Sequence, residues 1–280
     1  MSAQGMGDHR MLGEAPAITP AEFAQIQRFI QQRAGIHLAA SKQSLVCGRL
    51  QKRLSACGVA SYGDYLALLG RPDGGAEAQT AVDLLTTNET YFFREPKHFD
   101  FLQDVARQAG PGTFRFWSAA SSSGEEAYSA AMVLDQARHG RPFEVLGTDI
   151  STRMLAIACR GQYPMQRLEH LPQAYLKRYC LRGQQEHAGS LLIDPALRSK
   201  VRFTQANLTT ALPRLGQFDV VFLRNVMIYF NQATKAQVIA RVIACLKPGA
   251  YLCIGHSEHL GDVQSGLKAL APSVYQKAIR

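Results

Sequence analysis

The sequence lacks the patterns that mark metal centres, disulfide frameworks and membrane spans. Its six cysteines are scattered over 280 residues without a CxxC pair or the spacing of a zinc site, so we expect free thiols in a reducing cytosol. No uninterrupted apolar run approaches the roughly 18 residues that a membrane span needs. An HExxH motif and a P-loop are missing too. We therefore expect no metal site and no direct insertion into a membrane.

Acidic residues are in short supply relative to basic ones. The chain has 31 Lys and Arg residues against 22 Asp and Glu residues, a net charge of +9. Such an excess permits a nucleic acid, an anionic membrane surface or an acidic protein as partner, and it is equally compatible with a role in solubility alone. The charge therefore does not select a partner by itself.

The N-terminal part of the chain has helical patterns. Residues 1–18 contain no apolar run and are expected to form a disordered tail. A helix is predicted over residues 19–35, because Thr19 and Glu22 have the spacing of a capping box and Gly35 is a stop signal.

Three more helical stretches follow before the pattern changes. The run RPDGG between the second and third of them is a turn or linker signal. We assign residues 19–76 to an N-terminal helical domain and residues 77–280 to a second domain. The three stretches cover residues 41–58, 62–69 and about 77–85.

After residue 112, short apolar segments alternate with helical patterns. This alternation predicts an α/β domain with a parallel sheet that helices cover on both faces. Over about residues 164–201 the short runs YCLRG and SLLID indicate an inserted subdomain of short strands and a helix. The main strands are predicted in TFRFWSAA, FEVLGTDI, VRFTQANL, FDVVFLRN and AYLCIGHS, with VYQKAI as a closing strand.

Polar residues follow the predicted strands, where ligands of open α/β sheets bind. The first strand is followed by SSSGEE, in which one glycine precedes two glutamates. Carboxylates disfavour a pyrophosphate and favour a cationic or amino-bearing ligand, although an acidic helix cap would have the same sequence. Asp149 ends the second strand and can bind ribose hydroxyls, or simply cap a helix. Together they favour an adenosine-type ligand without a pyrophosphate, such as S-adenosylmethionine.

Five stretches match a known family in order and spacing: TTNETYFFRE, WSAASSSGEEAYS, LGTDIS, ANL and FLRNVMIYFN. From about residue 19 to the end, the sequence resembles the CheR family of chemotaxis receptor methyltransferases. The resemblance implies an S-adenosylmethionine-dependent protein-glutamate O-methyltransferase, with S-adenosylhomocysteine as product. It also implies a Rossmann-like class I methyltransferase sheet with an inserted small β-subdomain, preceded by an all-α N-terminal domain that docks receptors.

The resemblance also implies roles for individual residues. Arg94 and Tyr229 would be catalytic, with Tyr229 facing the methyl group, although a partly buried core tyrosine is the alternative. Glu125 would meet the methionyl amine and Asp149 the ribose. The implied cofactor contacts are Asn88, Thr90, Arg94, Glu125, Asp149, Asn207, Leu208, Arg224 and Asn225. A glutamate substrate is already ionised at neutral pH, so alignment rather than a catalytic base is expected to matter.

The implied partner is the cytoplasmic domain of methyl-accepting chemotaxis receptors. Residues 42–53 hold four bases and no acid, which is typical of a dock for an acidic surface or of an ordinary solvated face. The inserted subdomain would hold a C-terminal peptide tether of the receptor by strand addition, since its loop at residues 182–189 is full length. The four docking bases are Lys42, Arg49, Lys52 and Arg53.

Three other functions are compatible with parts of the sequence. A nucleic-acid methyltransferase fits the charge, but RNVMIY stands where an Asn/Asp-Pro-Pro-aromatic motif would be expected. A cofactor-binding adaptor and a nicotinamide dehydrogenase are the others, and the loop chemistry disfavours the dehydrogenase. We expect a cytoplasmic monomer that is recruited to receptor clusters and does not act on nucleic acid.

Overall fold

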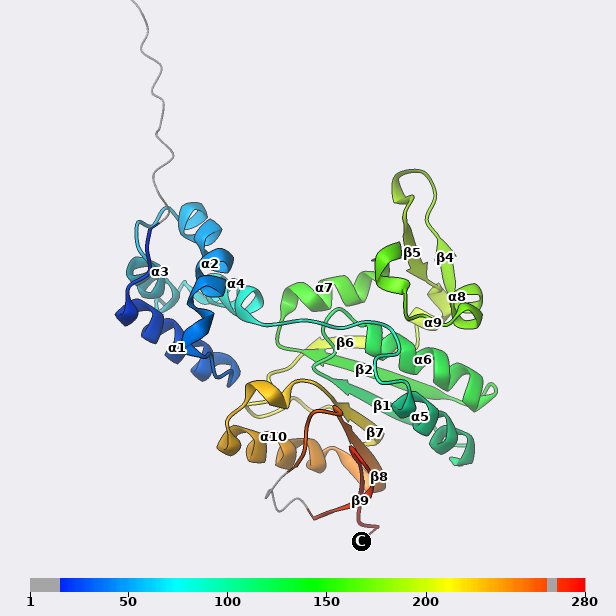
Figure 1. Cartoon of the computed structure of the whole chain (residues 1–280). Coiled ribbons are helices and arrows are strands. Elements are labelled where there is room, and N and C mark those ends of the chain that lie inside the picture. Colours follow the sequence, from blue (N-terminus) through cyan, green and yellow to red (C-terminus); the bar gives the residue numbers. More distant parts are fainter. Residues whose placement is uncertain (1–15, 261–265, 280) are drawn as a thin grey trace, which may run out of the picture.

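The computed structural model describes residues 16–260 and 266–279. The predicted disordered tail therefore lies almost wholly outside the described residues. Along the chain, a helical bundle is followed by a larger α/β unit that carries a small second sheet (Figure 1). In the part of the chain that the structure describes, no helix combines the length and the apolar character needed to cross a bilayer.

Sequence signals set the ends of the helices in the bundle. The predicted capping box is present, because the Thr19 hydroxyl accepts from the backbone N–H of Glu22 at 3.2 Å while the Glu22 carboxylate accepts from that of Thr19 at 2.8 Å. Gly35 and Gly58 end the first two α-helices in the left-handed conformation. The elements are α1 Pro20–Ala34, η1 Ala40–Lys42, α2 Gln43–Cys57, α3 Tyr62–Leu69 and α4 Gly75–Leu85.

Helix α4 is part of this bundle. Its buried residues Ala78, Val82 and Leu85 belong to the same apolar cluster as Ile26 of α1 and Leu50 of α2. The run RPDGG looked like a domain linker because proline and glycine mark turns, but it only connects α3 to α4. The expected domain boundary thus falls inside α4, and the chain leaves the bundle where that helix ends.

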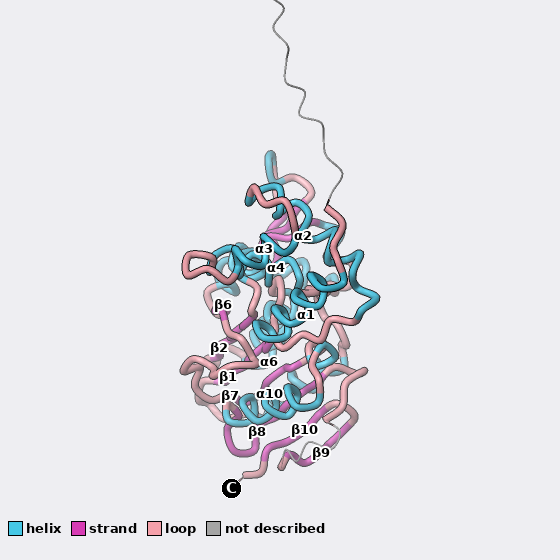
Figure 2. The backbone as a smooth tube through the Cα atoms, turned by 90° about the vertical axis from the view of Figure 1, so that its left-hand side faces the viewer, coloured by secondary structure: helices cyan, strands magenta, loops and turns pink. Residues whose placement is uncertain are grey.

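A seven-stranded sheet forms the centre of the α/β unit. Its order is β6-β2-β1-β7-β8-β10-β9; β6 to β8 run parallel, and β10 is antiparallel to both of its neighbours. Figure 2 shows this succession, from β6 nearest the bundle to β9 farthest from it. The strands are β1 Phe114–Ala119, β2 Phe143–Asp149, β6 Val201–Gln205, β7 Phe218–Leu223, β8 Leu246–Ile254, β9 Leu267–Ala271 and β10 Val274–Lys277.

Alternate residues of the central strands are buried on opposite faces of the sheet. In β7, Val220 and Phe222 join one apolar cluster, whereas Val221 and Leu223 join the other. Helices α5 and α6 contribute to the first cluster and α10 to the second, so the predicted two-sided cover is confirmed. The helices are α5 Lys97–Gln108, α6 Glu125–Arg138, α7 Thr152–Arg160 and α10 Gln232–Ala244.

Helix α5 and strand β9 were not predicted from the sequence. In α5, His98, Phe99, Leu102 and Ala106 are buried at helical spacing, a pattern that the neighbouring aromatic run obscured. Strand β9 has the sequence LKALA, whose residues favour a helix, and most of it is exposed. Its pairing with β10 decides its conformation.

The predicted insert is confirmed as a β-subdomain between α7 and β6. Its sheet has the order β3-β5-β4 with antiparallel pairing, so β4 is an edge strand. Its elements are β3 Gln162–Pro164, η2 Met165–Leu168, α8 Gln173–Tyr179, β4 Cys180–Arg182, η3 Gln185–His187, β5 Ser190–Ile193 and α9 Pro195–Arg198.

Several contacts tie the bundle to the α/β unit, and two of them are made by Asp83 and Ile36. Asp83 of α4 is buried and accepts from the backbone N–H groups of Thr152 (3.0 Å) and Arg153 (3.1 Å), and so caps α7. Ile36, just after α1, pairs with Phe230 as an antiparallel bridge. Both contacts join the units on the side where the parallel strands end.

Candidate functional site

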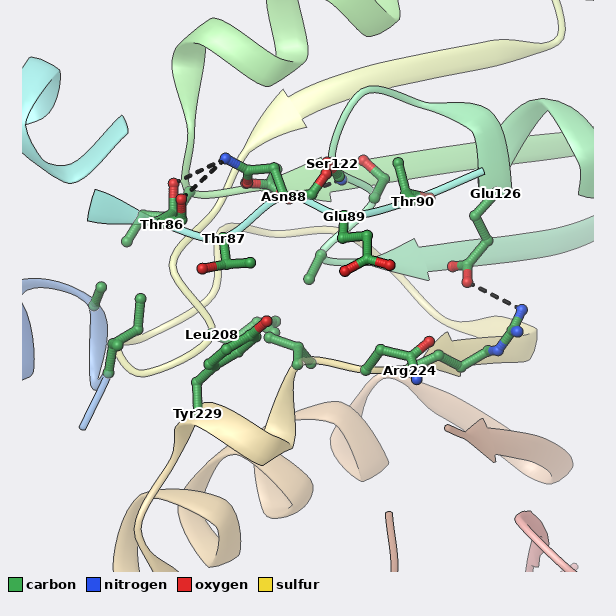
Figure 3. Close-up of a pocket in the computed structure, with 18 of the residues that line it drawn as sticks. Thr86, Thr87, Asn88, Glu89, Thr90, Ser122, Glu126, Leu208, Arg224 and Tyr229 are labelled. Atoms are coloured by element: carbon green, nitrogen blue, oxygen red, sulfur yellow. Dashed lines mark hydrogen bonds and ion pairs between the residues drawn. The ribbon is translucent and has the colours of Figure 1, made fainter. Parts of the chain in front are cut away.

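The carboxyl ends of the parallel strands line a cavity that opens to solvent, with about 870 Å³ of free space when its open mouth is included (Figure 3). The loops after β1, β2, β6 and β7 form one side, as expected for an open α/β sheet. The other side comes from Ala34 and Ile36 of the bundle and from the segment TTNETYFFRE, which runs from α4 to α5. Two units of the chain therefore share one cavity.

Nearly all of the predicted catalytic and cofactor-binding residues meet at this cavity. Glu125 is the exception. The lining also contains residues that sequence reasoning missed, including Ala34, Ile36, Glu89 and Glu126. The predicted residues in the lining are Asn88, Thr90, Arg94, Asp149, Asn207, Leu208, Arg224, Asn225 and Tyr229.

The two glutamates that open α6 point in different directions. Successive helical residues are about 100° apart around the axis. Glu125 is fully buried and accepts from Arg167 of the β-subdomain at 2.7 Å and from Ser123 at 2.7 Å. Glu126 lines the cavity (Figure 3). It accepts from the Ser118 hydroxyl at 2.6 Å. The structure thus brings Glu126, and not the predicted Glu125, to the cavity.

The single glycine of this loop has a structural task. Gly124 has φ 96°, and a Cβ there would lie 2.8 Å from Cβ of Ala158 and 3.0 Å from the Tyr163 hydroxyl. Only glycine suits that conformation and that close approach of α7. Gly124 therefore allows Ala158 and Tyr163 to pack closely against the loop, rather than making room for a ligand.

Asp149 stands at the end of β2 with both carboxylate oxygens in use. One oxygen accepts from the backbone N–H of Ser122 and the other from that of Ser151, each at 2.8 Å. Burial raises the pKa of Asp149, and these two hydrogen bonds oppose the rise. Each oxygen retains a lone pair, so the carboxylate can still accept from two hydroxyls of a ribose.

Arg224, at the end of β7, is fully engaged by the protein. Its side chain has no exposed surface and forms ion pairs with Glu126 (3.2 Å) and Glu95 (3.1 Å). It also donates to the backbone carbonyl of Arg94, and its guanidinium lies 5.2 Å from the ring centroid of Phe222. Figure 3 shows the guanidinium turned towards Glu126. Its donors therefore anchor the segment 86–95 to the sheet.

Glu95 is the acceptor at the centre of this cluster. Burial would raise its pKa, but His98, Arg224 and Asn225 outweigh burial and hold the pKa well below the usual range. Among the described residues, Glu95, His98 and His256 bring possible metal-ligand atoms within 4.8 Å of one another. Because the same carboxylate already neutralises a buried guanidinium, a second cation would compete with Arg224. We interpret the group as a hydrogen-bonded anchor.

The segment TTNETYFFRE divides its side chains between core and cavity. Phe92 is fully buried and its ring meets that of Tyr163 at 5.1 Å. Phe93 and Glu95 have left-handed backbones, with φ 55° and 56°. These turns let neighbouring residues face opposite ways, so Arg94 reaches the cavity while Glu95 turns to the cluster described above. This explains why the sequence shows neither strand nor helix periodicity.

The remaining predicted residues form the wall below the segment. Asn207 donates to the backbone carbonyl of Arg33 in α1 at 2.7 Å. Leu208 and Tyr229 belong to one apolar cluster and lie side by side in Figure 3. Tyr229 ends the 3₁₀ turn η4 Met227–Tyr229, and its carbonyl accepts from the backbone N–H of His37 at 2.8 Å.

The four predicted docking bases do not form one free face. Arg49 donates to the carbonyls of Leu85 and Thr86, each at 3.1 Å, and joins α2 to the end of α4. Arg53 pairs with Glu77 at 2.6 Å, and this hydrogen-bonded partner raises its pKa. Two bases are thus used inside the bundle, and the two that are exposed are Lys42 and Lys52.

Comparison with protein families assigns both units. The CheR methyltransferase all-alpha domain matches residues 21–86, and the CheR methyltransferase SAM binding domain matches residues 88–275. The mostly parallel sheet and the matched domain define a class I methyltransferase that binds S-adenosylmethionine. The chain belongs to the CheR methyltransferase family.

Relatives cover most of the chain. It is 41% identical to a chemotaxis protein methyltransferase of Klebsiella aerogenes, over 92% of this chain and 90% of that protein. It is 39% identical to the chemotaxis protein methyltransferase of Escherichia coli K12, over 94% and 92%. Among solved structures, the glycopeptide N-methyltransferase MtfA complexed with S-adenosylmethionine matches with a TM-score of 0.34 at 18% identity, covering 56% of this chain and 53% of that one.

Proposed function

We propose that this chemotaxis methyltransferase transfers the methyl group of S-adenosylmethionine to glutamate side chains of chemotaxis receptors, forming methyl esters in sensory adaptation. Family membership supports the cofactor and the chemotaxis role. The choice of a carboxylate as acceptor rests on one observation: the two arginines of the cavity differ in how many hydrogen-bond donors they have to spare.

Arg94 is the arginine with donors to spare. Its one hydrogen bond to the described residues runs from Nη1 to the backbone carbonyl of Glu89 at 2.9 Å. Its guanidinium lies 5.7 Å from the ring centroid of Tyr91, which holds it at the cavity. Nε and Nη2 can therefore receive a carboxylate as a fork, either the methionyl carboxylate of the cofactor or that of an incoming glutamate, and we propose the glutamate. Arg224, saturated by Glu95 and Glu126, cannot do so.

The reaction needs little proton chemistry. When bound, the cofactor supplies a methyl group on a sulfonium leaving group. A substrate carboxylate has a reference pKa of about 4.3 and is ionised at neutral pH, and no histidine lines the described cavity. The substrate oxygen gains the methyl group as the carbon–sulfur bond breaks, and no proton moves. Alignment of the kind that Arg94 and Tyr229 provide can supply roughly 7–11 kcal/mol.

The lining suits the parts of the cofactor. Asp149 has lone pairs for the ribose, and Ala34, Ile36 and Leu208 supply apolar surface for the adenine beside Asn207. Glu126 and Glu89 are the carboxylates in reach of the methionyl ammonium, in the place expected for Glu125. The groups proposed to complete the polar contacts are Asn88, Thr90 and Asn225.

Receptor binding is proposed at two places. The cytoplasmic domain of a receptor would approach Lys42 and Lys52 on the bundle. A C-terminal peptide tether would pair with the edge strand β4 of the β-subdomain, where Leu181 is 48% exposed. The enzyme would then act as a monomer in the cytoplasm, recruited to receptor clusters.

A labelled cofactor tests the acceptor group. Methyl-labelled S-adenosylmethionine is incubated with a receptor cytoplasmic fragment and, separately, with nucleic acid, and the products are treated with mild base. Label on the receptor that is released as methanol supports a glutamate ester, because N- and C-methyl groups survive base. Base-stable label on the receptor or on nucleic acid would overturn the proposal.

A further inference from the structure

The loop after β7 carries five residues of the cavity. Arg224, Asn225 and Tyr229 all lie within six residues of one another and line the same wall. Asn225 has φ 57°, a left-handed conformation that asparagine tolerates better than most residues but that still needs support. Something outside the loop must hold this backbone in place.

The support comes from one carboxylate on the loop after β8. Oε2 of Glu258 accepts from the backbone N–H groups of Asn225 (2.9 Å) and Gly255 (2.8 Å). Its Oε1 accepts from those of Met227 (2.7 Å) and Ile228 (3.3 Å). Glu258 is 8% exposed, so these four bonds are shielded from competing water.

The approach of the two loops is tight. A Cβ on Gly255 would lie 2.6 Å from Nδ2 of Asn225 and 2.8 Å from Oε2 of Glu258. On its other side, Nδ2 of Asn225 donates to Glu95 at 3.2 Å. Asn225 is therefore held from two directions, at its backbone by Glu258 and at its side chain by Glu95.

We propose that Glu258 is a positioning residue for methyl transfer. It does not line the cavity, and it acts by fixing the backbone that presents Asn225 and Tyr229. The choice of receptor glutamate as substrate rests on the proposed function, but the effect on cofactor binding depends only on the methyltransferase fold. The sequence GHSEH, which carries no catalytic signal by itself, thus supplies the support of the catalytic loop.

Glu258→Gln gives the main test. Whichever way the amide turns, its NH₂ faces two backbone donors and only one oxygen still accepts. We expect the turnover number with a receptor fragment at saturating cofactor to fall about 10- to 100-fold, as for a small misplacement of catalytic groups. The KM for the fragment stays within about two-fold of wild type, and the Kd for S-adenosylhomocysteine rises in calorimetry.

The matched control is Asp219→Asn. Asp219 sits at the opposite end of β7 and accepts from the backbone N–H of Arg115 at 2.7 Å and from Lys247 at 2.7 Å. Its loss is expected to lower the melting temperature and leave turnover and cofactor Kd unchanged. If Glu258→Gln behaves in the same way, Glu258 is merely structural and the proposal is wrong.

A second variant covers the case in which Glu258→Gln does not fold. Gly255→Ala leaves every charge in place, and its added methyl group would collide with the side chains of Asn225 and Glu258. It is expected to reduce turnover in the same sense, and wild-type values for turnover and cofactor Kd would overturn the proposal. If wild-type protein does not methylate the receptor fragment, the proposed function fails, while the cofactor Kd values still decide the role of Glu258.

Discussion

The cavity has two walls of different character. At the wall that follows β7, Arg224 forms ion pairs with Glu95 and Glu126, and Glu258 accepts from the backbone of the same loop. The wall formed by the segment 86–94 presents Glu89 and Arg94, whose charged ends have few or no partners among the described residues. A saturated arginine such as Arg224 can hold a geometry but has no donor left for a substrate carboxylate. An unsaturated wall can grip a ligand, and here it depends on the other wall for its position.

The largest effect on stability is expected for Arg224→Met, which removes the arginine of the saturated wall. The variant leaves the largely buried carboxylates of Glu95 and Glu126 without their arginine, and the loss of one partner of a buried ion pair typically costs about 3–5 kcal/mol. Urea denaturation measures the loss, with Arg224→Lys as the variant that keeps the charge but not the fork. A loss below about 1 kcal/mol, the size of an exposed ion pair, would contradict the network described here.

Arg94→Ala tests the opposite wall. Turnover with the receptor fragment is expected to fall about 100-fold or more, the scale for losing one preorganised charged donor. The melting temperature should change little, because the side chain makes one hydrogen bond. Steady-state kinetics and calorimetry separate the effects, and Arg94→Lys shows how much of the fall is due to the fork. Equal losses of turnover and cofactor binding would remove the substrate-gripping role.

The saturated wall also predicts a dependence of stability on pH. Burial lowers the pKa of His98 in the folded chain, so only the unfolded chain takes up a proton readily. The contribution of neutral His98 to the free energy of unfolding is complete above the ordinary pKa of about 6.5. It is lost as the pH falls from there to the lower pKa of the folded chain, by about 1.4 kcal/mol for each unit by which the two pKa values differ. Melting temperatures at pH 7.5 and 5.5 should differ less in His98→Gln than in wild type. The exposed His187→Gln is the control and should match wild type.

The smallest effect is expected at the bundle surface. Reversal of Lys42 and Lys52 to Glu should raise the KM for the receptor fragment. The factor should correspond to a loss of about 0.2–1 kcal/mol of binding free energy per residue, and to less at high salt. Cofactor affinity should not change. Arg53→Gln should instead lower the melting temperature, because its partner Glu77 lies within the bundle. A normal KM in the double reversal would exclude docking at this face.

Local signals explain how much of the fold could be predicted. Capping residues such as Thr19 and Gly35 act within one helical turn, so the ends of α1 could be predicted from the sequence. The strands β1 and β7 were readable because both of their faces are buried, which demands continuous apolar runs. Strand β9 was not readable, because its pairing with β10 overrides a helix-forming sequence.

The sequence could predict which loops form the site, but not which side chain of each loop faces the cavity. The order of the strands brings Asp149 and Arg224 to one edge, which a sequence pattern can indicate. Which of the adjacent residues Glu125 and Glu126 faces the cavity depends on the rotation of α6. Whether Arg49 is free depends on carbonyls at the end of α4, and both are tertiary facts that no single stretch of sequence contains.

The cap that Asp83 places on α7 has a thermodynamic consequence. Together with the bridge between Ile36 and Phe230, it makes the bundle and the sheet share one cavity. A ligand that touches both units stabilises both, by an amount that grows with its concentration over its Kd. The bundle then cannot open without releasing the ligand, so its amide protons should exchange more slowly when the cavity is filled. By reciprocity, a partner that binds the bundle in one arrangement will also sense whether the cavity is occupied.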